Sequence, residues 1–227
     1  MEMTFTTTAC NRPSVLKRTY ESYCNKLKGI DFNKSTLYIN IDPAPNSNNI
    51  GLVKEIAESY FGNVICNFSN TANFANAVIW CFSKVDTKYF FNLEDDWILL
   101  KDVNIKDVLN KFNENTLQCI LNKNKKVTLK REFGEPAFVP SVFSTEIMKK
   151  YLNLLDTSRN PEAQFKYIYR KNTNGLKKYN SLYLNKNIEY SRDIGRVWLQ
   201  KNGLKRDYAK TSKTNNNNKW SPWVSWK

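Results

Sequence analysis

Three adjacent carboxylates, Glu94, Asp95 and Asp96, follow an apolar, aromatic-rich run at residues 88–93, and apolar residues resume at 97–100. Neighbouring acids repel one another, so a chain that keeps them at the end of a buried strand needs something to offset their charge. Oxygen-rich clusters of this kind hold hard divalent cations such as Mg²⁺ or Mn²⁺, usually together with substrate phosphates. A solvated turn is the alternative interpretation, but turns rarely lie between two such apolar flanks.

The residue types that are missing or scattered restrict the chemistry further. The chain has no His, so acid–base catalysis and metal ligation fall to other side chains. Its five cysteines contain no CxxC pair. With no start typical of a signal peptide and no apolar run of about 18 residues, this pattern predicts reduced thiols in a cytoplasmic protein. A chain of 227 residues suits one domain with a substantial core.

Positive charge is concentrated towards the end of the chain. Residues 164–227 carry 15 Lys or Arg and three acids, a net of +12, whereas residues 1–163 carry a net of +2. A uniform codon bias would not sort charge in this way. The asymmetry favours a surface for a polyanion such as nucleic acid. An ordinary solvated face is the alternative.

The elements that must position these residues alternate along the first half of the chain. Strand composition recurs at residues 3–8, 37–41, 63–67 and 89–93. Between them, apolar residues recur with helical spacing at residues 15–27 (with Ser14 as a cap), 50–61 and 72–82. Such alternation predicts an α/β fold, a mostly parallel sheet flanked by helices, in a single domain. Ligands of open sheets bind beyond the carboxyl ends of the strands, which is where the three acids stand.

The second half is less regular. Its patterns predict a loop and strand at residues 135–144, a strand at 182–188, and helices at 145–155, 161–170 and 193–202. Residues 211–219 are of low complexity, and Trp220, Trp223 and Trp226 follow them. We expect this last segment to be mobile.

Four features, in this order, resemble glycosyltransferases of the GT-A fold, in particular the family 2-type group. They are a Thr-rich strand ending in Asn11-Arg12-Pro13, a strand ending in Asp42, a helix with Asn73, Asn76 and Ala77, and Glu94-Asp95-Asp96 as a DxD-like motif. The resemblance covers residues 3–100 well and the remainder in outline. It implies a Rossmann-like GT-A domain over residues 1–210, with a nucleotide-sugar-binding half (1–100), an acceptor half (101–210) and a basic, Trp-rich tail (211–227).

The resemblance implies a nucleotide-sugar donor, a UDP-sugar being the expected one, and Mn²⁺ or Mg²⁺ to offset the charge of the leaving diphosphate. The implied donor-binding positions are Thr7, Thr8, Ala9, Arg12, Asp42, Asp95 and Arg196. The implied metal ligands are Glu94, Asp96 and Asp193, the last in place of a His that the family often has near the C-terminus. Asp42 is equally consistent with a plain turn. Asp193 could instead cap the helix that follows it, and Asn73 and Asn76 could cap a helix or lie on its surface.

An inverting enzyme of this family needs a carboxylate to accept the acceptor's proton, and Glu162 has the position where the family usually places it. Glu162 follows Asn160-Pro161 at a predicted helix start. A Glu early in a helix also stabilises the helix dipole with no catalytic meaning. Asp156 and Glu135 are the rival candidates.

The charge asymmetry favours DNA with a hydroxylated base as the acceptor, as in phage DNA hypermodification, which would place the protein in the cytoplasm of a host. A duplex base would have to flip out to reach the donor. Phosphate contacts and base stacking are expected from Lys177, Lys178, Lys205, Arg206, Lys210, Lys213, Trp220, Trp223 and Trp226. The alternatives are a glycan or lipid-linked acceptor at an anionic membrane and a non-catalytic nucleic-acid-binding module with structural acids.

Overall fold

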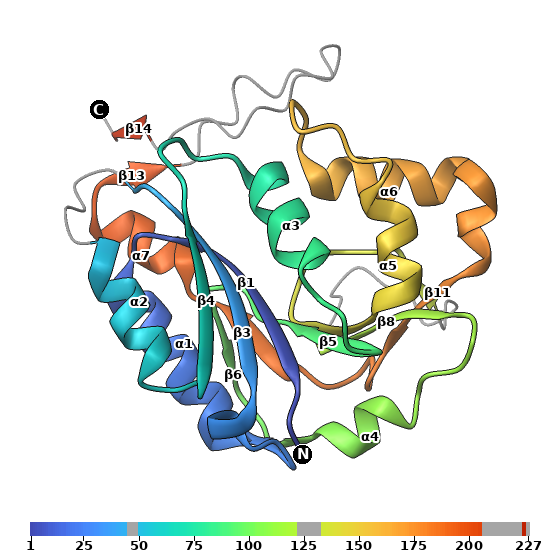
Figure 1. The fold of residues 1–227 in the computed structure, drawn as a ribbon, viewed down its shortest axis with the longest axis horizontal. Coiled ribbons are helices and arrows are strands. Elements are labelled where there is room, and N and C mark those ends of the chain that lie inside the picture. Colours follow the sequence, from blue (N-terminus) through green and yellow to red (C-terminus); the bar gives the residue numbers. More distant parts are fainter. Residues whose placement is uncertain (45–49, 122–132, 206–223, 226–227) are drawn as a thin grey trace.

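The computed structural model describes residues 1–44, 50–121, 133–205 and 224–225 (Figure 1). A central sheet is built from eight strands: β1 (Thr4–Cys10), β3 (Thr36–Asp42), β4 (Asn63–Phe68), β5 (Tyr89–Asn92), β8 (Thr116–Ile120), β9 (Phe133–Gly134), β10 (Ser141–Ser144) and β11 (Asn180–Tyr183). Their order across the sheet is β4-β3-β1-β5-β10-β8-β11-β9.

The sheet is mostly parallel. β4, β3, β1 and β5 are parallel neighbours, and β8 pairs with β11 in parallel. β10 runs antiparallel to both β5 and β8, and β9 runs antiparallel to β11. The predicted α/β fold with a mostly parallel sheet in one domain is confirmed.

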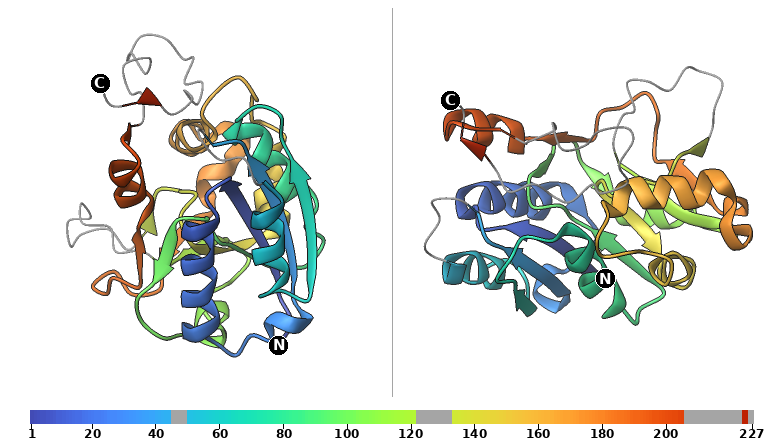
Figure 2. Two further views of the ribbon diagram at one scale, coloured as in Figure 1. Left: turned by 90° about the vertical axis from the view of Figure 1, so that its left-hand side faces the viewer. Right: turned by 90° about the horizontal axis from the view of Figure 1, so that it is seen from above.

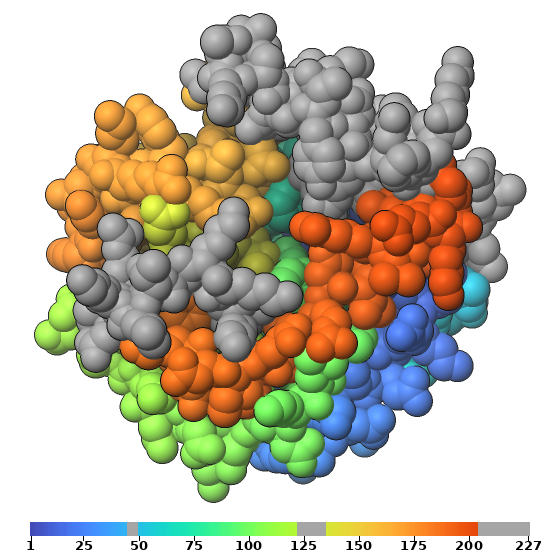
Figure 3. Space-filling view, turned by 180° about the vertical axis from the view of Figure 1, so that it is seen from behind, coloured from blue at the N-terminus to red at the C-terminus, as the bar shows by residue number. Residues whose placement is uncertain are grey.

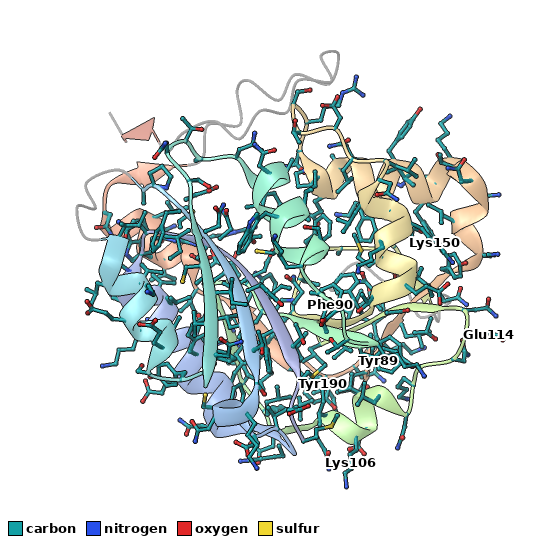
Figure 4. All side chains as sticks on the ribbon, viewed as in Figure 1. Tyr89, Phe90, Lys106, Glu114, Lys150 and Tyr190 are labelled. Atoms are coloured by element: carbon teal, nitrogen blue, oxygen red, sulfur yellow. The ribbon has the colours of Figure 1, made fainter. Side chains whose placement is uncertain are left out.

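Helices cover both faces of the sheet. α1 (Pro13–Lys26) and α2 (Ile50–Glu58) pack on one face, and α3 (Phe74–Ser83), α5 (Thr145–Leu152) and α6 (Pro161–Lys171) pack on the other. Successive residues of a strand point to opposite faces, so β5 contributes to both layers. Phe91 contacts Tyr23 of α1, with ring centres 5.7 Å apart, whereas Phe90, labelled in Figure 4, contacts Phe82 of α3 at 4.8 Å.

Shorter elements complete the described part of the chain. They are β2 (Leu27–Lys28), β6 (Trp97–Leu99), β7 (Val103–Asn104), β12 (Ser191–Asp193), β13 (Leu204–Lys205), β14 (Val224–Ser225), α4 (Ile105–Leu109), α7 (Gly195–Lys201) and the 3₁₀ helices η1 (Phe32–Lys34) and η2 (Thr173–Lys178). Three two-stranded pairs form: β6 with β12, β2 with β7, and β13 with β14. Within the described ranges, no helix combines the length and the apolar character needed to cross a membrane.

Several predicted boundaries are corrected by the structure. α1 begins at Pro13, one residue before the predicted cap Ser14, because a Pro at the first helical position loses no hydrogen bond and has a suitable φ. The strand predicted at 182–188 is β11, which ends at Tyr183. The helix predicted from residue 193 begins at Gly195 because residues 191–193 pair with β6.

Candidate functional site

The three acids lie at the edge of the sheet where the carboxyl ends of β1, β3 and β5 meet. They form the turn between β5 and β6, and the N–H of Leu93 just before them donates to the Thr6 carbonyl of β1 at 2.8 Å. The register of β1 and β3 places Cys10 beside Asp42 at the same edge. Open α/β sheets bind their ligands at this edge.

Arg12 connects the end of β1 to the acidic turn through a buried ion-pair network. Its Nη2 lies 2.7 and 2.8 Å from the two carboxylate oxygens of Asp95 and 3.1 Å from Oδ2 of Asp96. The three residues are only 2%, 4% and 6% exposed, respectively. Asp95 is fixed further, because its Oδ2 accepts the Cys10 N–H at 3.0 Å and its carbonyl accepts the Thr19 hydroxyl at 2.9 Å.

Burial and the oppositely charged partner both shift the pKa values of Asp95 and Arg12. Burial raises the pKa of Asp95 to about 6, although Arg12 acts in the opposite direction. Burial alone would lower the pKa of Arg12, but Asp95 and Asp96 outweigh it and raise that pKa above its usual value. The guanidinium is consequently a permanent positive charge between two carboxylates.

The start of α7 packs directly against Asp96. β12 runs antiparallel to β6, which places Asp193 opposite Trp97, and the Ile194 N–H donates to the Asp96 carbonyl at 2.8 Å. A Cβ atom at Gly195 would clash with Oδ2 of Asp96, so this close approach requires glycine. In Figure 3 the orange-red segment that contains β12 and α7 lies on the surface beside the green segment around β6.

Asp193, a predicted metal ligand, is bound to its own helix. Its Oδ1 accepts the Gly195 N–H at 2.8 Å, and its Oδ2 lies 3.4 Å from Nε of Arg196, whose side chain is 79% exposed. Asp193 therefore binds the start of α7 from one residue before the N-cap position, which Ile194 holds. The aromatic ring of Trp198, on the same helix, lies over the Arg12 guanidinium, 5.6 Å from its carbon.

The three predicted metal ligands do not come together. Among the residues that the structure describes, no three Asp, Glu, Cys or His side chains form a group able to hold a metal ion. Glu94 is half-buried, and its charge acts on the buried hydroxyl of Tyr23, where burial and then Glu94 raise the pKa. Of the three, Asp96 is the acid that lies beside Asp95 in the buried network, with its Oδ2 3.1 Å from Nη2 of Arg12.

Arg12 was predicted to face the phosphates of a donor, and the structure gives it other partners. The guanidinium is buried against Asp95 and Asp96 and under Trp198. In this conformation it does not present a free fork to a ligand. Gly195 and Trp198, which the sequence patterns did not single out, help to enclose the same network.

Asp42 and Asn73 organise the neighbouring strand end. Asp42 is buried, and its two carboxylate oxygens accept from Asn40 Nδ2 at 2.8 Å and from the Asn73 N–H at 3.0 Å. Burial raises the pKa of Asp42, against the hydrogen bonds that it accepts. Asn73 in turn caps α3 by accepting the Asn76 N–H at 3.0 Å, and its Nδ2 donates to the Thr157 carbonyl at 3.2 Å. The capping interpretation of Asn73 is confirmed.

The other predicted nucleoside-binding positions lie on β1. Thr7 is fully buried and its Oγ1 accepts the Tyr20 hydroxyl at 3.2 Å, so its side chain belongs to the core. Ala9 is also buried, and Thr8 is half-buried. Any contact of Thr7 with a nucleoside would have to come from its backbone.

Glu162, the predicted base, lies in the first turn of α6. Asn160 caps this helix by accepting the Ala163 N–H at 3.0 Å, and the half-buried Glu162 accepts from Lys166 at 2.7 Å. Because Asn73 binds Thr157, the loop that leads to α6 is joined to the strand end that holds Asp42.

The two rival bases, Glu135 and Asp156, also have partners within the protein. Glu135 receives two hydrogen bonds of 2.7 Å from Arg170. Asp156 accepts the Ser158 N–H at 2.8 Å, which lowers the pKa of its carboxyl. Glu135 thus joins its segment to α6, and Asp156 holds its own loop.

Of the residues predicted to contact nucleic acid, the structure describes the side chains of Lys177 and Lys178. Lys177 and Lys178 are exposed in η2, beside Tyr179, whose hydroxyl lies 3.1 Å from Nζ of Lys150 on α5. Figure 4 labels Lys150, and Figures 1 and 2 show that α5 and α6 lie away from α7. Of Lys205 only the backbone is described, in β13, and the remaining predicted contacts lie outside the described residues: Arg206, Lys210, Lys213, Trp220, Trp223 and Trp226.

The predicted domain limits and tail stay predictions. Two residues of the tail, Val224 and Ser225, pair with Lys205 and Leu204, and the rest of 211–227 lies outside the described residues. Two surface hollows of about 430 and 690 Å³ share residues 86–89, at the amino-terminal end of β5. They lie at the opposite end of that strand from the acids and do not mark the candidate site.

Comparison with known proteins gives a likeness in fold. No model of a protein family matches the chain, and no curated protein matches its sequence. TarS of S. aureus in complex with UDP-GlcNAc has a TM-score of 0.57 at 10% identity, over 84% of this chain and 58% of TarS residues 1–349. The mannosyltransferase PcManGT of Pyrobaculum calidifontis, in complex with GDP-Man and Mn²⁺, has a TM-score of 0.58 at 10% identity, over 80% of this chain and 54% of its own.

A longer TarS structure is matched over 36% of its length, at a TM-score of 0.56 and 10% identity. The chain therefore spans less than two thirds of each of these proteins. At such low identity the likeness concerns the fold and not the activity. The fold that the sequence predicted, a GT-A-like α/β domain, is confirmed.

Proposed function

We propose that this protein is a glycosyltransferase that moves a sugar from a nucleotide-sugar donor to a hydroxyl group of an acceptor. The observation that carries the proposal is the buried Asp95–Asp96 pair at the carboxyl edge of a mostly parallel sheet. Buried acids are costly to fold, and in this fold they stand where ligands bind. The UDP-GlcNAc and the GDP-Man with Mn²⁺ in the neighbouring structures support a nucleotide-sugar donor, and a UDP-sugar is the donor that we expect.

Asp96 is the proposed contact to a divalent cation, Mn²⁺ or Mg²⁺, that arrives with the donor diphosphate. When bound, such a cation offsets the negative charge that develops on the leaving nucleoside diphosphate. Asp95 holds Arg12 and shapes the turn that presents Asp96. Arg196, exposed on the first turn of α7, supplies a positive charge for the phosphates.

Glu162 is the proposed general base. The acceptor oxygen attacks the anomeric carbon while its proton passes to the Glu162 carboxylate. The bond from that carbon to the diphosphate oxygen breaks, and the nucleoside diphosphate leaves with the electron pair. A single displacement of this kind inverts the anomeric configuration.

For the acceptor, we propose a hydroxylated base in DNA. The support is the net charge of +12 in residues 164–227, since a protein that neutralises phosphates needs such a surplus. Lys177 and Lys178 are exposed as this role requires.

The donor site is tested by Asp96→Asn. We expect the wild-type protein to be stabilised by a UDP- or GDP-sugar with Mn²⁺, by about 2.7 kcal/mol at 100 times the dissociation constant. Asp96→Asn should lose this stabilisation, because a neutral amide is a poor ligand beside a diphosphate. Thermal shift over a panel of nucleotide sugars, with Mn²⁺ or EDTA, measures it. Asp102→Asn, at an exposed acid, is the control. Unchanged Mn²⁺-dependent binding by Asp96→Asn would refute the assignment.

The general base is tested by Glu162→Gln. Turnover should fall by about 10²–10⁴, the usual contribution of a positioned base, while donor affinity stays the same. Glu146→Gln is a closely matched control, because Glu146 also lies in the first turn of a helix and pairs with a Lys four residues later, at 2.9 Å. Release of nucleoside diphosphate in the presence of acceptor gives the rate. Normal turnover in Glu162→Gln, or a loss equal to that of Glu146→Gln, would exclude Glu162.

The acceptor is tested by the salt dependence of DNA binding. The protein should bind duplex DNA with little sequence preference, and removal of residues 211–227 should weaken binding while nucleotide-sugar binding survives. The logarithm of the DNA-binding constant falls linearly with the logarithm of the salt concentration. This slope should become flatter by about 0.9 for every DNA phosphate that the shortened protein no longer neutralises. If the intact protein does not bind DNA at low salt but sediments with anionic vesicles, DNA is not the acceptor. A lipid-linked or glycan acceptor then takes its place. DNA binding with no nucleoside diphosphate release from any donor would favour the non-catalytic module.

A further inference from the structure

The charge at the acidic turn is already partly balanced by the protein itself. Asp95 and Asp96 contribute two negative charges, and Arg12 contributes one positive charge between them. All three side chains are nearly inaccessible to solvent. The pairing is therefore a fixed part of the fold, unlike an exposed ion pair that forms and breaks in solution.

The geometry of Arg12 leaves little room for another cation. Its Nη2 lies within 2.8 Å of both carboxylate oxygens of Asp95, so it occupies the side of that carboxylate on which a metal ion would bind. It also approaches Oδ2 of Asp96, at 3.1 Å. The ring of Trp198 lies over the guanidinium, and Gly195 packs close to Oδ2 of Asp96 and to Nη1 of Arg12. A divalent cation that entered this space alone would meet a positive charge that cannot move away.

We propose that Arg12 is the resident cation of the acidic turn and prevents a divalent cation from binding there on its own. A cation then binds at Asp96 only when the phosphates of a nucleotide supply the further oxygen ligands and the further negative charge. This second half rests on the proposed function, whereas the first half concerns Arg12 and the two acids alone.

The proposal implies a latent metal site. Replacing Arg12 by a neutral side chain leaves two adjacent carboxylates with no counter-charge, and paired carboxylates with free oxygens are the ligands that Mn²⁺ and Mg²⁺ prefer. Replacing it by Lys keeps the positive charge. The two substitutions at the same position therefore separate the charge of Arg12 from its contribution to packing.

The experiment measures Mn²⁺ binding to the full chain in the absence of nucleotide, from the electron paramagnetic resonance signal of free Mn²⁺. Wild type and Arg12→Lys should bind Mn²⁺ weakly and to a similar extent. Arg12→Gln should bind it at least tenfold more tightly, and Arg12→Gln/Asp96→Asn should lose that gain. Equal Mn²⁺ affinity of wild type and Arg12→Gln would overturn the proposal.

A second measurement on the wild-type protein applies even where Arg12→Gln fails to fold. Mn²⁺ binding is titrated with and without UDP or GDP, and binding should require the nucleotide. Mn²⁺ bound as tightly without nucleotide as with it would contradict the role of Arg12. Failure of both nucleotides to bind at all would instead refute the proposed function, and tight Mn²⁺ binding by the wild-type protein alone would still overturn the first half.

Discussion

The buried pairing of Arg12 with Asp95 and Asp96 is the interaction on which the rest of this site depends. It joins the end of β1 to the turn after β5, and the start of α7 packs on the same carboxylates. Two adjacent acids in a buried turn would otherwise repel each other. Removing one member of such a network leaves a charge buried without a partner, which typically costs about 3–5 kcal/mol. The sheet edge, the turn and α7 are therefore held as one unit.

A second buried acid organises the neighbouring strand end in a similar way. Asp42, at the end of β3, binds the backbone of Asn73, which caps α3 and also binds the loop before α6. Through these contacts the helix that carries Glu162 is tied to the same edge of the sheet as Asp96. Asp95 and Asp42 thus hold the strand ends in place beside the two residues proposed to meet the ligands, Asp96, which pairs with Arg12, and Glu162, which pairs with Lys166.

The sequence predicted the first half of the fold well because strands and helices alternate there in clear patterns. β8 was missed although Thr116 and Gln118 alternate with Leu117 and Cys119, because the run is only five residues long and both of its polar side chains are buried. The role of Arg12 was not predictable from local pattern, because its partner Asp95 lies 83 residues away. The same holds for Gly195 and Trp198, whose importance comes from packing against a distant turn. Asp193 was expected at a metal, but its Oδ1 accepts a hydrogen bond from the backbone of the helix that follows.

The central claim, that Arg12 and Asp95 hold the site together, is tested most directly by a double-mutant cycle. Unfolding free energies in denaturant are measured for wild type, Arg12→Gln, Asp95→Asn and the double variant. Each single change should be destabilising, because Arg12→Gln leaves two buried carboxylates without their counter-charge and Asp95→Asn leaves the buried guanidinium with Asp96 as its remaining acidic partner. The double variant should lose much less than the sum, with a coupling energy on the order of 2 kcal/mol. Effects that add to within about 0.5 kcal/mol would contradict this claim.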